Sequence, residues 1–237
     1  MPERNEQEMR ELFCEIGRRM YENELLAATD GNLSAKLSDE KLIFTPGGSA
    51  LGHMEPEDLV ITDLEGQLLE GDKEVTSEYR LHLTCYEERD DIEAVVHAHP
   101  PYTLALTIAG VSLARPILPE VVFNLGSIPT APYATPSSPQ GPEVIRELVR
   151  VHDAMAIDRH GAVTVGKTLE DAYLKLEKVE HASKIHHLAR QLGVIKVLPK
   201  KEVEKLKKVG AEAGLNPEAV LPDPSWDLPG NLDDTEG

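Results

Sequence analysis

Apolar positions recur with helical spacing in two long stretches of the chain. In residues 6–23 they fall at i, i+3, i+4, i+7 and i+11 from Met9, which predicts an amphipathic helix. Residues 168–192 show the longest such pattern, with a capping signal at Thr168 and a terminating glycine at Gly193. Shorter helices are expected over residues 76–88, 102–109, 142–152 and 200–208.

Short apolar runs, rich in β-branched residues and separated by turn signals, predict strands. We expect strands over residues 33–37, 41–44, 59–63, 67–69, 93–99, 128–133, 154–157 and 162–165. The early strands are close together in the chain, so antiparallel pairing is expected there, with a hairpin turn at Glu65-Gly66. Pro129 and Pro132 predict an edge or bulged position for their strand.

The alternation of helices and short strands predicts one α/β domain with a largely antiparallel sheet. The chain has 237 residues, which is enough for a full hydrophobic core. We expect the domain to span residues 1–214 and residues 215–237, rich in Pro, Asp and Gly, to form an extended tail. Such a tail either lies on another subunit or is disordered.

Composition narrows the class of partner. The net charge of −18 argues against nucleic acid and against anionic membranes, since both would be repelled, but it does not exclude a phosphorylated small molecule. There is no apolar run of transmembrane length and no basic-then-apolar leader, which predicts a cytoplasmic protein. Cys14 and Cys85 fall in helical patterns and are expected to be packed, reduced thiols.

The most informative stretch is E-A-V-V-H-A-H-P, residues 93–100. Side chains two apart on a strand point to the same side, so His97 and His99 project from one face. Two neighbouring imidazoles form a bidentate metal clamp, although one packed and one hydrogen-bonded histidine is the ordinary alternative. His160, in a turn before Gly161, is the natural third ligand, and three histidines with an open position are typical of catalytic zinc.

Glu78 has two interpretations. It lies at the start of a predicted helix, where an acidic residue favours the helix dipole and Thr76 or Ser77 is a fair N-cap. Beside a metal it would be a fourth ligand or a general base. The remaining helical histidines, His181, His186 and His187, have spacings that do not converge on one ion. We interpret those three as packing or surface residues.

Glycine-containing loops and one helix start offer free backbone N–H groups suited to phosphate. The candidate phosphate-binding residues are Gly31, Asn32, Gly47, Gly48, Thr76 and Ser77. A serine nucleophile is not expected, because the chain lacks a G-x-S-x-G elbow.

Several motifs, in this order, resemble those of the class II aldolase/adducin family, and most closely its L-fuculose-1-phosphate aldolase type, over roughly residues 8–192. They are Gly31-Asn32-Leu33-Ser34, Thr45-Pro46-Gly47-Gly48, Ser77-Glu78-Tyr79-Arg80-Leu81-His82, His97-Ala98-His99-Pro100 and His160-Gly161. The resemblance implies a single three-layer α/β/α domain with a central, mainly antiparallel sheet, and a homotetramer of fourfold symmetry with sites at subunit boundaries. It also implies zinc at His97, His99 and His160, an acid/base at Glu78, and phosphate at the six residues named above.

Two departures from the family pattern concern the substrate. Gly47 stands where the fuculose enzyme has a hydroxyl residue, which leaves only backbone contact there. Leu118-Pro119-Glu120 replaces a stretch that supplies a tyrosine to the neighbouring subunit. Leu118 cannot donate a proton, so that role is vacant or moves across the subunit boundary to Glu120 or to a tail residue.

The resemblance predicts a metal-dependent aldolase that reversibly cleaves a small phosphorylated ketose to dihydroxyacetone phosphate and an aldehyde. Related epimerases, dehydratases and decarboxylases are the alternatives. The epimerase and dehydratase branches have a different residue where Glu78 stands, which favours the aldolase. A non-catalytic adducin-like scaffold would lack the metal histidines, and all three are present here. A His-site metallohydrolase on an unrelated fold is the remote alternative.

Overall fold

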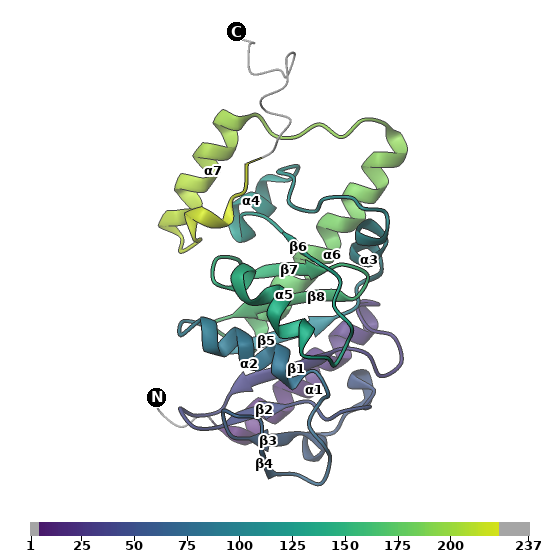
Figure 1. The fold of residues 1–237 in the computed structure, drawn as a ribbon, viewed down its shortest axis with the longest axis vertical. Coiled ribbons are helices and arrows are strands. Elements are labelled where there is room, and N and C mark those ends of the chain that lie inside the picture. Colours follow the sequence, from purple (N-terminus) through teal and green to yellow (C-terminus); the bar gives the residue numbers. More distant parts are fainter. Residues whose placement is uncertain (1–4, 223–237) are drawn as a thin grey trace.

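The computed structural model describes residues 5–222 and is built around one eight-stranded sheet (Figure 1). In sheet order the strands are β4 (Leu68–Glu70), β3 (Val60–Thr62), β2 (Leu42–Phe44), β1 (Asn32–Lys36), β5 (Ala94–Ala98), β8 (Gly161–Gly166), β7 (Ala154–Ile157) and β6 (Thr130–Ala131). Every neighbouring pair is antiparallel except β6 and β7. The prediction of a mainly antiparallel sheet is therefore confirmed, and β6 is an edge strand as its prolines indicated.

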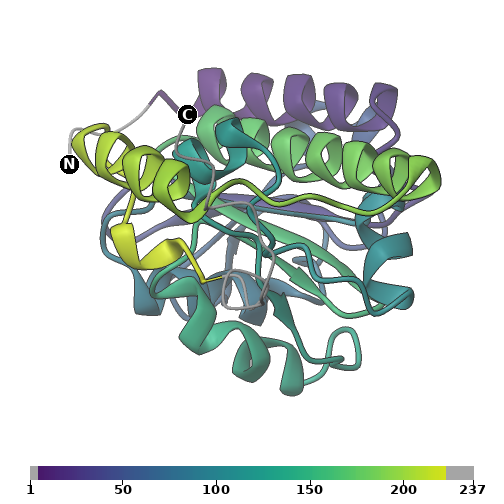
Figure 2. The ribbon, with the colours of Figure 1, turned by 90° about the horizontal axis from the view of Figure 1, so that it is seen from above.

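Helices cover both faces of this sheet. They are α1 (Glu6–Glu22), α2 (Tyr79–Glu88), α3 (Pro101–Ile108), α4 (Pro119–Leu125), α5 (Gln140–Val149), α6 (Leu169–Leu192) and α7 (Lys200–Glu212). Side chains of α1, α3, α4 and α6 share one apolar cluster with one face of the sheet, while those of α2 and α5 pack on the other. Seen from above, the sheet lies between α1 and α6 on one side and α5 on the other (Figure 2). The predicted three-layer α/β/α architecture is confirmed.

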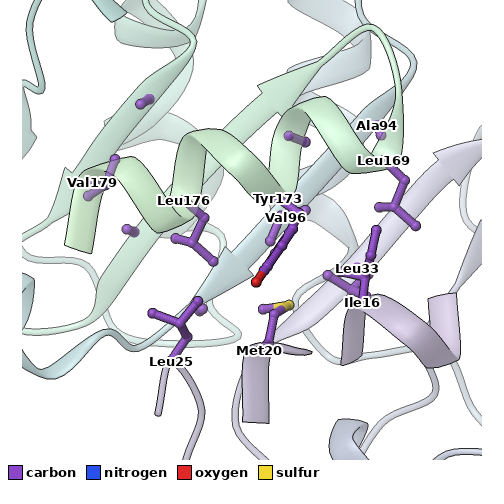
Figure 3. Close-up of a cluster of buried hydrophobic side chains, with 14 of the residues drawn as sticks. Ile16, Met20, Leu25, Leu33, Ala94, Val96, Leu169, Tyr173, Leu176 and Val179 are labelled. Carbon is purple, nitrogen blue, oxygen red and sulfur yellow. The ribbon is translucent and has the colours of Figure 1, made fainter. Parts of the chain in front are cut away.

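The core beneath β5 holds the centre of the sheet rigidly. Figure 3 shows Tyr173 and Leu176 of α6 lying over the sheet, with Met20 of α1 beside them. Leu33 and Val96 meet these helices from β1 and β5, and both are fully buried. Truncating a buried leucine such as Leu176 to alanine costs about 2–5 kcal/mol of stability. This packing fixes β5, whose opposite face carries His97.

The first turn of α2 differs from the prediction. The helix begins at Tyr79, and its N-cap is Glu78 rather than Thr76 or Ser77. The Glu78 side chain makes no capping hydrogen bond. Its backbone N–H donates instead to Thr76 Oγ1 at 3.4 Å.

Two further helices differ from their predicted form. Helix α5 begins at Gln140, so Pro142 occupies the third helical position rather than the first. A proline is tolerated throughout the first turn because those N–H groups have no partner within the helix. Helix α4 was not predicted, and its Val122 packs with Val203 of α7. Long-range packing thus selects a helix for an apolar, β-branched segment whose local preference is weak.

The beginning of the predicted tail folds onto this chain. Pro217–Ala219 form a short 3-10 helix, and the Leu221 N–H donates to Ser127 Oγ at 2.9 Å. Ala219 is almost fully buried. Over residues 215–222 the expectation of an extended tail is therefore wrong, while residues 223–237 lie outside the described residues. Among residues 5–222, no helix has both the length and the apolar composition needed to cross a membrane.

Candidate active site

His97 lies on β5, the fifth strand in sheet order, between β1 and β8. Neighbouring Val96 and Ala98 face the α1 and α6 layer, so alternation points His97 to the α2 side, where it is fully buried. Its Nδ1–H donates to the Ala162 carbonyl at 3.0 Å, which leaves Nε2 as the free nitrogen. His99 follows the strand, and its Nε2 lies 3.2 Å from that of His97. The predicted convergence of these two imidazoles is confirmed.

His160 reaches the same point from the turn between β7 and β8. Arg159, just before it, adopts the left-handed conformation with φ of 56°. At Gly161 a Cβ atom would lie 2.3 Å from the Ala98 carbonyl oxygen and 2.9 Å from His97 Cε1. A side chain here would push the turn away from β5, so glycine is required for His160 to approach.

Glu78 turns its carboxylate toward the histidines instead of capping its own helix. Oε2 lies 3.1 Å from His97 Nε2, and Oε1 lies 3.1 Å from His160 Nε2. The helix-start interpretation of Glu78 is therefore incomplete, because the backbone caps the helix while the side chain belongs to the cluster.

This cluster of Glu78, His97, His99 and His160 fits a divalent metal ion. One ligand atom from each residue lies within 4.8 Å of all the others. Both ring nitrogens of His160 are buried. Its Nδ1 makes no hydrogen bond within residues 5–222, and its Nε2 faces the Glu78 carboxylate at 3.1 Å. Unpaired buried nitrogens are costly, and three imidazoles beside a carboxylate are ligands that zinc and its neighbours accept.

Electrostatics at the cluster favour a carboxylate beside neutral or cation-bound imidazoles. Burial alone would raise the pKa of Glu78, but the His97 and His160 imidazoles outweigh it and hold that pKa below its usual range. Burial and the repulsion of His97 and His160 lower the pKa of His99 to about 4. Burial opposes protonation of His97, yet Glu78 raises its pKa, so a cation that binds there competes with a proton.

The candidate phosphate residues lie in two groups around this cluster. The loop at Gly47 runs beside the segment before α2, because Pro46 bridges to Val75 and the Gly47 N–H donates to the Glu74 carbonyl at 3.0 Å. Gly47 therefore stands next to Thr76. Gly48 has a φ of +68°, and its N–H makes no hydrogen bond within the described residues.

The second group joins the cluster directly. A Cβ at Gly31 would lie 3.0 Å from the His97 carbonyl oxygen, so this loop passes close to β5. The Asn32 amide donates from Nδ2 to Glu78 Oε2 at 3.1 Å. Ser77 Oγ lies 2.7 Å from Ser137 Oγ, which brings residues 135–138 to the rim beside Glu78 and His160. Ser137 was not anticipated, and its only sequence signal is the Pro-Ser-Ser turn that contains it.

Glu120 does not join the cluster within this subunit. It lies in the first turn of α4 and, with Leu118, lines a separate cavity of about 770 Å³. That cavity shares no lining residue with the metal cluster. The two cysteines are packed thiols, because burial raises the pKa of Cys85 to about 12 and, with nearby acidic residues, that of Cys14 to about 11.

Helix α2 and strand β1 also contain polar residues for which no role was predicted. His82, Ser34 and Tyr86 form hydrogen bonds that lead from Asn32 away from the cluster. The signal that could have found them is spacing, because Glu78, His82 and Tyr86 are four apart on a helix while Asn32 and Ser34 are two apart on a strand.

Comparison with known proteins agrees with this geometry. A 3-oxo-tetronate 4-phosphate decarboxylase from Haemophilus influenzae is 33% identical over 205 residues, covering 85% of this chain and 97% of the relative. A 5-deoxy-D-ribulose 1-phosphate aldolase from Bacillus thuringiensis is 31% identical over 204 residues, covering 85% and 95%. The solved structure of an L-fuculose 1-phosphate aldolase superposes with a TM-score of 0.77 at 28% identity, covering 83% and 93%.

The family described as Class II Aldolase and Adducin N-terminal domain matches residues 11–187, a span that contains the whole metal cluster. The chain belongs to the class II aldolase and adducin family.

Proposed function

We propose that the chain is a divalent-metal-dependent lyase that reversibly cleaves a small phosphorylated ketose to dihydroxyacetone phosphate and an aldehyde. The observation that carries this proposal is a single carboxylate, Glu78, at a buried cluster of three imidazoles. A scaffold would not need these groups, because crowding three buried imidazoles around one carboxylate costs stability unless a ligand binds them. The similarity to two aldolases of sugar phosphates supports the same reaction class.

Zinc is the proposed ion, held by His97, His99 and His160. An ion bound there supplies Lewis-acid chemistry, since it polarises a carbonyl and stabilises negative charge that develops on oxygen. The hydrogen bond from His97 Nδ1 to the Ala162 carbonyl, at 3.0 Å, orients the His97 ring so that its Nε2 can bind the ion.

Glu78 is the proposed acid/base. In the synthetic direction it takes a proton from the hydroxymethyl carbon of dihydroxyacetone phosphate, and the resulting enediolate attacks an aldehyde. In cleavage, the enediolate is released first, and Glu78 returns the proton to the same carbon. The low pKa of the carboxyl group keeps it deprotonated, as a general base must be, and Asn32 holds one of its oxygens at 3.1 Å.

The phosphate is proposed to lie at the N-terminus of α2 and the facing loop. Gly48 offers an N–H without a partner in the described chain, and Ser77 lies just before the helix, whose dipole favours an anion. Gly31, Asn32, Gly47 and Thr76 complete the proposed set.

Decarboxylation is the second candidate, and Leu118 favours it. A 2-hydroxy-3-oxo acid that carries a 4-phosphate leaves the same enediolate when its carboxylate departs as carbon dioxide. That departure needs no protein group to take a proton, whereas aldol cleavage needs one at the aldehyde oxygen. Leu118 cannot take this proton, and Glu120 lines a separate cavity in its own subunit. The similarity to a 3-oxo-tetronate 4-phosphate decarboxylase supports this alternative.

Two parallel assays separate the candidates. Purified protein with zinc is incubated with dihydroxyacetone phosphate and a series of short aldehydes, and separately with 3-oxo-tetronate 4-phosphate. The aldolase proposal expects a new ketose 1-phosphate with several aldehydes and slow or no release of carbon dioxide. Fast release of carbon dioxide without aldol product rejects the aldolase in favour of the decarboxylase. Inactivity in both assays rejects the proposed function.

The active form is proposed to be a cytoplasmic homotetramer with sites at the subunit boundaries. A neighbouring subunit would then bring Glu120, or a residue after 222, to the site where an aldehyde oxygen is protonated. Sedimentation of the zinc-loaded protein at assay concentration tests this, and a fully active monomer contradicts it.

A further inference from the structure

Helix α2 and strand β1 are joined by a line of hydrogen bonds that ends at Glu78. Asn32 Nδ2 donates to Glu78 Oε2 at 3.1 Å, and Asn32 Oδ1 lies 2.5 Å from His82 Nε2. His82 Nδ1 lies 2.7 Å from Ser34 Oγ, which in turn lies 2.8 Å from the Tyr86 hydroxyl. The line passes back and forth between the helix and the strand.

The middle of this line is sealed from water. His82 and Ser34 are fully buried, and Asn32 is 4% exposed. The His82 ring also packs against Phe44, with ring centroids 5.6 Å apart. A buried polar atom without a partner costs about 1–3 kcal/mol, so each member of the line depends on its neighbours.

With a neutral His82 ring, only one arrangement of protons satisfies every contact. The Glu78 carboxylate accepts, so the Asn32 amide must present its nitrogen to Glu78 and its oxygen to His82. His82 must then carry its proton on Nε2, and its Nδ1 must accept from the Ser34 hydroxyl. Ser34 in turn accepts from Tyr86. The opposite His82 tautomer would set two acceptors against each other at the Asn32 oxygen.

We propose that His82 is a positioning residue for Glu78: its Nε2–H locks the Asn32 amide so that this amide aims the Glu78 carboxylate at the reacting carbon. The proposal rests on the acid/base role proposed above for Glu78. It assigns to a buried histidine a role that acts through two other side chains and that involves no contact with substrate or metal.

The metal makes this support necessary. The other close partners of the Glu78 carboxylate are the Nε2 atoms of His97 and His160, both at 3.1 Å. A bound cation would engage those nitrogens, because they are its expected ligands. Asn32 is then the partner that still holds Glu78, and the orientation of its amide depends on His82. Burial, with added repulsion from His97, lowers the pKa of His82 to about 3, which agrees with a neutral ring at neutral pH.

The first test needs no substrate. Long-range nitrogen–proton correlation spectra of the full chain, labelled with nitrogen-15 in histidine, report the tautomer of each ring. The signals of His82 are assigned by comparison with His82→Gln. We expect His82 to be neutral and protonated on Nε2 at pH 7, with and without added zinc. A ring protonated on Nδ1, or on both nitrogens, overturns the proposal.

The second test uses hydrogen exchange between water and the hydroxymethyl carbon of dihydroxyacetone phosphate, the step assigned to Glu78. His82→Leu should keep bound zinc and lower the exchange rate at saturating substrate about 10- to 100-fold. The KM should change less than the rate, because His82 holds neither the metal ligands nor the five proposed phosphate residues other than Asn32. His82→Gln can still donate near the position of Nε2 and should recover most of the rate. Thr84→Val, at a buried position on the same helix outside this line, serves as the matched control.

A double-mutant comparison separates positioning from general damage. If His82 acts through Glu78, His82→Leu should change the residual rate of Glu78→Gln by less than about twofold. An equal loss in both backgrounds overturns the proposal, as does a His82→Leu variant with the wild-type rate. If the leucine variant does not fold, Ser34→Ala replaces it, and a wild-type rate there overturns the proposal as well. A wild-type protein that exchanges no hydrogen rejects the proposed function instead, while the tautomer measurement remains valid.

Discussion

Two regions of the molecule contain fully buried histidines that are treated in opposite ways. At the candidate metal cluster, His97 and His99 bring their Nε2 atoms to 3.2 Å of each other, and His160 Nε2 faces the same Glu78 carboxylate as His97. By contrast, both ring nitrogens of His82 have hydrogen-bond partners within 2.7 Å. The first set crowds three imidazoles around one carboxylate, as a bound cation would require, whereas His82 is arranged to hold other side chains.

Burial without a partner is not sufficient to mark a metal site. His152 Nδ1 and His186 Nε2 are also buried and unpaired in the described chain. Neither belongs to a group of three or more potential ligands within residues 5–222. What distinguishes the cluster is convergence, because three rings from β5, the residue after it and the β7–β8 turn point at one position.

Removal of the convergent imidazoles should give the largest effect. The protein should purify with about one divalent ion per chain, as three imidazoles with an open position suit zinc. His97→Ala and His99→Ala should each lose the ion and the activity together, while the matched control His186→Ala keeps both. Elemental analysis alongside the activity assay checks this. Full metal retention by the double variant His97→Ala/His99→Ala would show that the cluster is not the site.

Glu78→Gln separates the acid/base from the ligands. The amide keeps the size of the side chain but cannot take a proton, so turnover should fall about 100- to 10,000-fold while zinc remains bound. Glu87→Gln, an exposed position on the same helix, is the control and should be silent. Turnover near wild type in Glu78→Gln, with only a small change in melting temperature, would reduce Glu78 to a residue of the helix start.

Gly161→Ala tests the close approach that brings His160 to β5. The new Cβ would meet the Ala98 carbonyl oxygen at 2.3 Å, so the turn must shift and carry His160 with it. We expect zinc affinity to fall about 10- to 100-fold, the range found when groups that orient metal ligands are altered. Gly141→Ala, whose Cβ would make only an ordinary contact at 3.6 Å, is the matched control in a chelator competition assay. Equal zinc affinity in the two variants would contradict the packing argument.

The last effect concerns how the free energy of unfolding depends on pH. Burial, with added repulsion from His97, lowers the folded-state pKa of His82 to about 3 from its ordinary value of 6.5. The unfolded chain therefore takes up a proton there first, so the stability from a neutral His82 is present above pH 6.5 and is lost as the pH falls toward 3. The loss is at most about 1.4 kcal/mol per pH unit.

Urea unfolding of metal-free wild type and His82→Gln between pH 7 and pH 4 isolates this contribution. The free energy of unfolding of the wild type should fall more steeply with decreasing pH than that of the variant. Parallel slopes would mean that His82 is not held neutral by the fold.

The sequence was sufficient for most of the fold and for the convergence of His97, His99 and His160, because both depend on local pattern. Alternation along β5 placed His97 and His99 on one side, and the glycine at 161 pointed to a close turn. The start of α2 was misplaced because Glu78 has a cluster role that competes with the usual capping preference. Helix α4 was missed because its conformation depends on Val203 of α7, which is far along the chain.

The line of hydrogen bonds from Glu78 to Tyr86 was missed for a different reason. His82 appeared only as part of a family motif. The spacing of four residues puts Glu78, His82 and Tyr86 on one side of their helix, but it does not say that this side will meet Asn32 and Ser34. Whether Glu120 reaches the cluster depends on the position of α4, a helix that was not predicted. In this subunit Glu120 lines a separate cavity. Residues after 222 lie outside the described chain, so their part in the site stays a prediction.

The most direct test of the account is hydrogen exchange into dihydroxyacetone phosphate in deuterated water, followed by proton NMR. Zinc-loaded wild type should replace one hydrogen at the hydroxymethyl carbon without any aldehyde present. Protein stripped of zinc, and zinc-loaded Glu78→Gln, should exchange at least about 100-fold more slowly. Exchange that persists without the ion or without the Glu78 carboxylate, or its absence from the zinc-loaded wild type, would contradict the assignment of this cluster as the catalytic centre.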